Sequence, residues 1–121
     1  IAGIGLFADE FIPKGICIWK FKEGFDMRVS KDYPDTLEEP AKSFFSTYAY
    51  QNPKTLNYVL CADNARFFNH SDTPNTDCVN NPEDEDTMDV ATRDIQIGEE
   101  LTIDYRKFDA NPLYGISSPT K

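Results

Sequence analysis

The chain has 121 residues and carries a formal net charge of −9, with an isoelectric point near 4.4. This length fits one small domain with a single modest core, so we treat residues 1–121 as one domain. The acidic balance argues against direct nucleic-acid binding, which relies on Lys and Arg. It favours basic partners such as Lys-rich tails, and a charge that serves only solubility is the alternative.

Cysteine usage and hydropathy narrow the setting of the protein. Cys17, Cys61 and Cys78 form no CxxC pair and His70 is the sole histidine, so a disulfide framework and a bound metal are both unexpected. We expect buried free thiols in a reducing compartment. No apolar run approaches the length of a bilayer span and no export signal is visible. We therefore expect no membrane association and an intracellular location, either cytoplasmic or nuclear, or inside a host cell for a viral or bacterial protein. The chain opens at Ile1 rather than Met, so residues upstream are expected to have been removed.

Short runs rich in β-branched and aromatic residues predict strands along most of the chain. In the last of them Leu101, Ile103 and Tyr105 share one face. No strand, glycine loop and long helix follow one another, so a dinucleotide-binding fold is excluded. The expected strands cover Ile4–Ala8, Ile16–Phe21, Asn57–Cys61, Thr87–Thr92 and Leu101–Tyr105, with turns at 13–15 and 97–99 and an acidic loop at 80–86.

Residues 35–50 give the one dependable helix. Five apolar residues fall on one face at helical spacing, and Pro40 is tolerated in a first turn, so the regular part should begin near Pro40. The face consists of Leu37, Ala41, Phe44, Phe45 and Tyr48.

Three motifs carry the functional signal. The first, Gly3-Ile4-Gly5, lets the backbone approach a ligand closely, although an ordinary tight turn would look the same. The second runs from Arg66 through Asn69, His70 and Ser71 to Asn75, and its Asn side chains suit an amino-acid-like ligand; a capped polar turn is the alternative. The third, Gly98-Glu99-Glu100-Leu101-Thr102-Ile103-Asp104-Tyr105, taken alone reads as a turn and a strand with a core tyrosine.

In this order and spacing, the three motifs resemble the SET domain of protein-lysine methyltransferases, from about Gly3 to Tyr105. The resemblance implies a mostly β fold of the β-clip type, with several small sheets, one short helical insert within residues 33–60 and a C-terminal pseudoknot. That pseudoknot would bring the second and third motifs together. Residues 106–121 would form a short tail.

The resemblance also implies S-adenosyl-L-methionine as cofactor and a catalytic Tyr105. Cofactor binding would fall to the backbone of Gly3, Ile4 and Gly5, to Arg66 near the cofactor carboxylate, to Asn69, and to the His70 backbone. Phe68, Ile103 and Tyr105 would line the channel for the target lysine, whereas Phe67 is expected in the core.

Some positions depart from the family pattern. Asp72 stands where many histone-directed members carry a zinc-binding Cys, and no Cys follows Tyr105. The chain therefore resembles minimal viral and bacterial members, which complete the cofactor pocket with an aromatic residue of the tail. Phe108 and Tyr114 are the candidates, with ordinary packing as the alternative for each.

The expected activity is lysine N-methylation of a basic, histone-like or other protein tail. An inactive SET-like module that binds peptides is one alternative, and intact Asn69, His70 and Tyr105 argue against it. A scaffolding domain is another, in which the helix face at Phe44, Phe45 and Tyr48 would make a homodimer.

Overall fold

The computed structural model describes residues 5–110, which form eight short strands and one α-helix. This mostly β composition agrees with the prediction. The strands are β1 (Cys17–Trp19), β2 (Met27–Val29), β3 (Tyr50–Gln51), β4 (Tyr58–Leu60), β5 (Asn69–His70), β6 (Thr76–Val79), β7 (Met88–Ala91) and β8 (Thr102–Ile103). The helices are α1 (Ala41–Tyr48) and the 3-10 turns η1 (Tyr33–Thr36), η2 (Asn64–Phe67) and η3 (Tyr105–Lys107).

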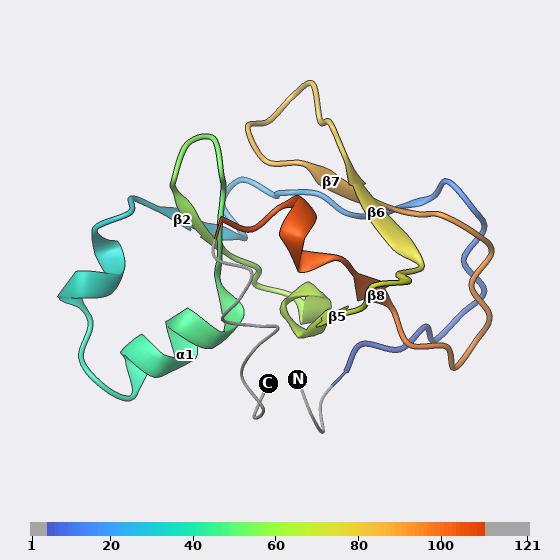
Figure 1. The fold of residues 1–121 in the computed structure, drawn as a ribbon, viewed down its shortest axis with the longest axis horizontal. Coiled ribbons are helices and arrows are strands. Elements are labelled where there is room, and N and C mark those ends of the chain that lie inside the picture. Colours follow the sequence, from blue (N-terminus) through green and yellow to red (C-terminus); the bar gives the residue numbers. More distant parts are fainter. Residues whose placement is uncertain (1–4, 111–121) are drawn as a thin grey trace.

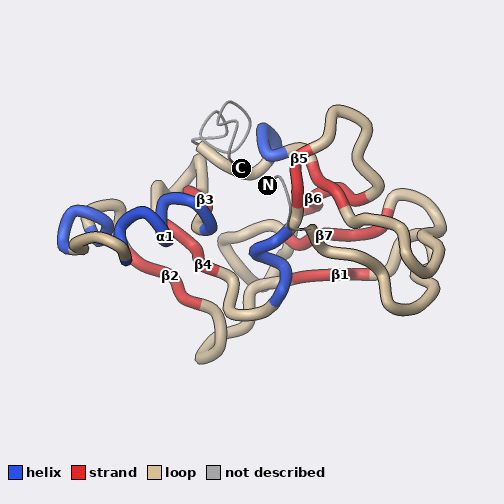
Figure 2. Tube along the Cα trace, turned by 90° about the horizontal axis from the view of Figure 1, so that it is seen from below, coloured by secondary structure: helices blue, strands red, loops and turns tan. Residues whose placement is uncertain are grey.

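The strands form three small sheets. Two are antiparallel, with the orders β1–β7–β6 and β2–β4–β3, and the third is the parallel pair β5–β8. Figures 1 and 2 show α1 and the β2–β4–β3 sheet at one end of the molecule and the β1–β7–β6 sheet at the other. No helix within residues 5–110 has the length and apolar character needed to cross a membrane.

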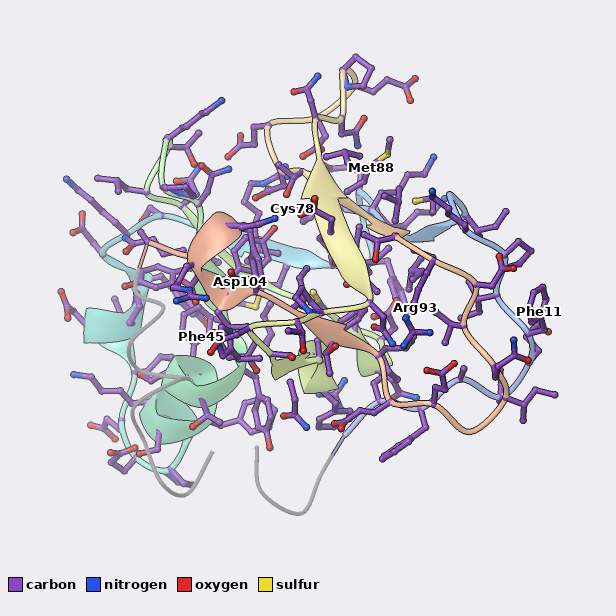
Figure 3. All side chains as sticks on the ribbon, turned by 45° about the vertical axis from the view of Figure 1, so that its right-hand side comes forward. Phe11, Phe45, Cys78, Met88, Arg93 and Asp104 are labelled. Atoms are coloured by element: carbon purple, nitrogen blue, oxygen red, sulfur yellow. The ribbon has the colours of Figure 1, made fainter. Side chains whose placement is uncertain are left out.

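The helix begins at Ala41, directly after Pro40, as the sequence predicts. Its apolar face is narrower than predicted, because only Phe45 is buried, between the rings of Tyr33 and Tyr58. Phe44 is 48% exposed and packs its ring against Tyr48. In Figure 3, Phe45 lies beside α1, on the opposite side of the molecule from the exposed Phe11.

Two groups of buried side chains form the core. The alternation predicted for the last strand is confirmed, because Leu101 and Ile103 are buried and Tyr105 packs against the same group. The first group is Ala8, Phe68, Ala91, Ile95, Leu101 and Ile103, and the second is Trp19, Phe21, Val59 and Cys61.

The thiols do not all behave as expected. Cys61 is buried in the second core group, and burial raises its pKa. Cys17 is exposed and Cys78 is only partly buried, so the prediction of buried thiols was wrong for these two. In a regular strand Cys17 and Trp19 would share one face, but the register of β1 shifts between them, and Cys17 is exposed while Trp19 is buried.

Candidate functional site

The second and third motifs meet in the β5–β8 pair. Asn69 lies opposite Thr102 and His70 opposite Ile103, and the Ser71 amide donates to the Ile103 carbonyl at 3.1 Å. The sequence separation of these strands exceeds thirty residues, so no local signal forms this pair. The predicted meeting of the two motifs is confirmed.

Asn75, at the end of the second motif, ties β8 in place. It is 4% exposed, donates through its side-chain amide to the Glu100 carbonyl at 2.8 Å and accepts from the Thr102 amide at 2.9 Å. Thr76, the next residue, donates its hydroxyl to the Thr102 carbonyl. These bonds satisfy backbone groups that a two-residue strand leaves unpaired, so Asn75 has a structural role.

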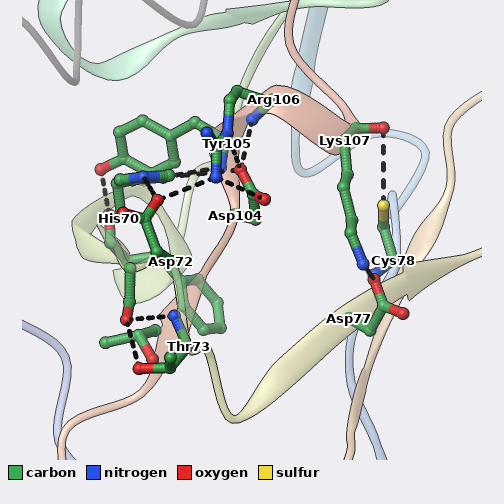
Figure 4. Close-up of polar contacts among 12 residues, drawn as sticks. His70, Asp72, Thr73, Asp77, Cys78, Asp104, Tyr105, Arg106 and Lys107 are labelled. Atoms are coloured by element: carbon green, nitrogen blue, oxygen red, sulfur yellow. Dashed lines mark hydrogen bonds and ion pairs between the residues drawn. The ribbon is translucent and has the colours of Figure 1, made fainter.

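Tyr105 follows β8 directly and points back toward the second motif. Its hydroxyl donates to the Phe68 carbonyl at 2.6 Å, and its backbone N–H donates to His70 Nδ1 at 3.1 Å (Figure 4). Burial first, and then the Asp109 carboxylate, raises the pKa of Tyr105 to about 12. The hydroxyl is therefore protonated at neutral pH and held at a fixed position.

The His70 side chain supports Tyr105. Because Nδ1 accepts the Tyr105 N–H, the ring proton is assigned to Nε2, which lies 3.1 Å from an Asp72 carboxylate oxygen. Asp72 also accepts from Arg106, which bonds Asp104 as well (Figure 4). Asp72 stands where many histone-directed family members carry a zinc-binding Cys. Here it is part of an exposed ion-pair network. Such pairs add little stability and here fix local geometry.

Gly5, Asn69 and Glu100 come together on the other side of β5. The Asn69 side-chain amide donates to Glu100 Oε2 at 2.6 Å. A Cβ on Gly5 would lie 2.5 Å from that same oxygen and 3.2 Å from the Asn69 amide nitrogen, so a side chain there would force the Glu100 carboxylate to move. The first motif therefore reaches the second, and it does so through a glycine that permits close backbone approach.

A cavity of about 670 Å³ opens between α1 and the β1–β7–β6 sheet. All three residues predicted for the substrate channel line it, namely Phe68, Ile103 and Tyr105. Its walls are rich in aromatic rings, and the further aromatic contributors are Trp19, Phe45, Tyr48, Tyr50, Tyr58 and Phe108. This size and lining are typical of ligand-binding sites.

Phe68 is buried in the core as well as lining the cavity, whereas Phe67 is not a core residue. Phe68 is 7% exposed and belongs to the first core group, while it also lines the cavity. Phe67 is only partly buried and packs edge-on against Tyr48, so its prediction as a core residue was wrong. The turn η2 ends at Phe67 and the chain then extends, which turns Phe68 rather than Phe67 inward.

Two predicted cofactor residues, Arg66 and Phe108, line this cavity instead of joining Gly5 and Asn69. The Arg66 guanidinium donates to the Ala62 and Asp63 carbonyls, lies over the Phe67 ring and leaves its buried Nε without a partner among the described residues. The Phe108 ring packs edge-on against Tyr50 and Tyr105. Gly3, Ile4 and Tyr114 lie outside the described residues.

Comparisons with known proteins agree with this geometry. The family model described as the SET domain matches residues 3–106. The chain belongs to the SET domain family. A comparison with curated protein sequences found no match.

Solved structures share this SET fold. A candidate histone methyltransferase from Plasmodium falciparum is 24% identical, with a TM-score of 0.56, over 84% of this chain and 82% of that one. A Neurospora SET domain protein, a histone lysine methyltransferase, is 21% identical with a TM-score of 0.54, over 84% of this chain and 47% of that one. Polycomb Repressive Complex 2 of Chaetomium thermophilum, bound to S-adenosylmethionine, is 18% identical with a TM-score of 0.62, over 97% of this chain and 15% of that one.

Two polar residues of the site were not singled out from the sequence. Glu100 sits inside the third motif, and its carboxylate could have been weighed as a partner for the amino group of an amino-acid-like cofactor. Asp89 lines the cavity from β7. Within residues 5–110, no three His, Cys, Asp or Glu side chains are grouped to hold a metal ion.

Proposed function

We propose that this SET domain transfers a methyl group from S-adenosyl-L-methionine to the side-chain amine of a lysine in another protein. One relationship carries the proposal. Phe68 faces the cavity and presents its carbonyl to the Tyr105 hydroxyl, while the next residue, Asn69, turns its side chain to Gly5 and Glu100. Two sites on opposite sides of one short strand suit a reaction in which cofactor and target approach from two directions.

The residues around Gly5 fit the amino-acid end of this cofactor. The Glu100 carboxylate is a natural acceptor for an ammonium group, and the Asn69 amide offers both donors and an acceptor. The space that a Cβ on Gly5 would fill lies directly against both side chains. When bound, the cofactor supplies an electrophilic methyl group on a sulfonium.

The aromatic cavity fits the target lysine. A lysine in water has a pKa near 10.4, so only about one in a few thousand is neutral at pH 7. Aromatic walls such as Phe68, Tyr50 and Phe108 remove water from the amine, and desolvation lowers the pKa of a buried lysine. The aromatic walls thus favour the neutral amine, whereas a carboxylate on the same wall, such as Asp89, favours the ammonium form in which a lysine first enters.

Tyr105 acts in this proposal as an orienting group. With a pKa of about 12 it is a poor proton acceptor at neutral pH. Its oxygen and the Phe68 carbonyl oxygen, 2.6 Å apart, form a polar pair on the cavity wall. Such oxygens attract polarised C–H groups weakly, and fixed positions matter more than strength when the reaction depends on alignment.

We further propose a basic protein segment as the substrate, on the strength of the net charge of −9. The acidic loop contributes less to this field than its composition suggests, because Asp84 and Asp86 both bond Arg28. Measuring transfer to a basic peptide between roughly 50 and 500 mM salt tests the field, since the screening length shrinks severalfold over that range. We expect the rate to fall with salt; a rate indifferent to salt would remove electrostatic selection.

Calorimetry with S-adenosyl-L-methionine in the presence of a metal chelator tests the cofactor assignment. We expect one cofactor per chain with undiminished affinity in chelator, because the proposed site uses a backbone, an amide and a carboxylate. Absence of binding, or binding that chelator abolishes, would contradict the assignment.

A further inference from the structure

One carboxylate on the cavity wall, that of Asp89, is not bonded to the rest of the described fold. Asp89 lies on β7, opposite Trp19 of β1 and Cys78 of β6, and its side chain lines the cavity. Its carboxylate makes no hydrogen bond or ion pair with any residue from 5 to 110, although most other aspartates of the site, such as Asp72, Asp104 and Asp109, are bonded. A partly buried carboxylate normally has a partner.

The surroundings of Asp89 supply no positive charge. Burial, and then the Asp77 carboxylate, raises the pKa of Asp89 to about 7. Arg66 is the one cation on the cavity wall among the described residues, and its guanidinium is turned to the Ala62 and Asp63 carbonyls. Lys107 bonds Asp77 and not Asp89. The Asp89 carboxylate therefore has no positively charged partner among the described residues. A cationic ligand could provide that partner.

The walls around it suit a long apolar stem. The Trp19, Tyr50, Tyr105 and Phe108 rings line the same cavity as Asp89. A side chain with a flexible hydrocarbon stem and a cationic end would pack its stem on these rings and bring its charge to the carboxylate. Neutral or acidic side chains of the same length would leave Asp89 unpaired.

We infer that Asp89 selects the target by accepting a hydrogen bond from the side-chain nitrogen of a lysine in the aromatic cavity, which makes it a specificity-determining residue. This inference rests on the proposed function, because it takes the cavity as the place where the target lysine enters. It goes beyond that function by assigning recognition of the amine to a residue outside the three motifs.

The test compares two peptides on two proteins. One basic peptide carries a central lysine and its twin carries norleucine, which keeps the hydrocarbon stem and lacks the nitrogen. We expect the unmutated protein to bind the lysine peptide about tenfold tighter, and Asp89→Asn to reduce that ratio to about threefold or less. Asp35→Asn, which removes the same charge from an exposed site outside the cavity, should keep the original ratio.

Each outcome decides the inference. Equal lysine-to-norleucine ratios in Asp89→Asn and the unmutated protein would overturn it, as would no preference for lysine in the unmutated protein. Should Asp89→Asn fail to fold, the carboxyl carbon of Asp89 can be followed by NMR in the unmutated protein. That signal should shift with the lysine peptide and stay in place with norleucine, and the same response to both would overturn the inference.

Methyl transfer is measured separately, so the two proposals can fail independently. Lysine selection through Asp89 without transfer would contradict the enzyme and leave the binding role in place. Transfer with a lysine preference that Asp89→Asn leaves unchanged would contradict the role of Asp89 and leave the enzyme.

Discussion

The Tyr105 hydroxyl donates a hydrogen bond to the Phe68 carbonyl at 2.6 Å, across 37 positions of sequence. Phe68 immediately precedes Asn69, whose side chain bonds Glu100 on the opposite side. Any shift of this short segment would therefore move the wall of the cavity and the Gly5 side together. The candidate chemistry depends on how rigidly β5 and β8 hold one another.

Changing Tyr105 to Phe should slow methyl transfer on the order of 10²-fold, the usual cost of losing one positioned polar group at a reacting centre. Cofactor affinity should change by less than about threefold, because the ring still fills its space and the Tyr105 hydroxyl bonds the Phe68 carbonyl rather than Gly5 or Asn69. Single-turnover rates and calorimetry on the same preparation separate the two effects. Full turnover in this variant would reassign Tyr105 as a core residue.

Replacing Asn69 with Ala should weaken cofactor binding by about 1–3 kcal/mol, because a polar partner is lost and Glu100 loses its amide donor. Asn57→Ala is the matched control, since Asn57 also donates its amide to a carboxylate, that of Glu85, but at an exposed site. The control should leave cofactor affinity unchanged. Equal affinities for the two variants would mean that Asn69 lies outside the cofactor site.

Gly5→Ala should displace the Glu100 carboxylate, because the new Cβ would come within 2.5 Å of it. Cofactor affinity should fall about tenfold or more. Thermal stability should fall less than in the Gly24→Ala variant. Gly24→Ala offers the opposite case: its Cβ meets nothing within 4 Å, but its φ of +80° strains an alanine. That variant should lose stability and keep cofactor affinity. Calorimetry and thermal unfolding of both variants would reveal the reverse pattern if the Gly5 site is only structural.

The Asp89 carboxyl should make stability depend on pH. Its pKa is about 7 in the fold, against an ordinary value near 3.9, so the folded state binds more protons between these values. Stability contributed by this group is therefore present at low pH and lost as pH rises through about 7. The groups facing it are Asp77, which bonds Lys107, and Cys61, Cys78 and Tyr50, whose raised pKa values keep them neutral there.

Asp89→Asn removes this titration. Relative to the unmutated protein, the variant should gain about 1–3 kcal/mol of unfolding free energy at pH 8, and the gain should shrink toward pH 5. Urea unfolding of both proteins at several pH values measures the difference, in which other titrating groups cancel. A difference that does not vary with pH would show that Asp89 titrates normally.

Local patterns predicted the parts of the fold that local forces set. The alternation of Leu101, Ile103 and Tyr105 correctly gave one buried face, and Pro40 correctly marked the start of α1. Strand β5 could not be found in this way, because Asn69 and His70 are polar and pair only with residues more than thirty positions away. The resemblance of the motifs to a family supplied that pairing.

The site was predictable where motifs mark it and not elsewhere. Phe68, Ile103 and Tyr105, expected from the motifs to line one channel, do line one cavity, and its use by a lysine stays a prediction. Asp89 was not found, because a charged residue in a strand is normally assigned to the solvent face; here it lies opposite Trp19 of β1, and both residues line the cavity. Arg66, expected near the cofactor carboxylate, lines the cavity from the turn η2, and its role with the cofactor stays a prediction.

The most direct test of the central claim is transfer of a labelled methyl group. The protein is incubated with labelled S-adenosyl-L-methionine and a proteome extract, and tandem mass spectrometry locates the label. We predict label on lysine side chains, concentrated in basic segments, and its near-complete loss with Tyr105→Phe. Label on another residue type, or none at all from a protein that binds the cofactor, would contradict a lysine methyltransferase.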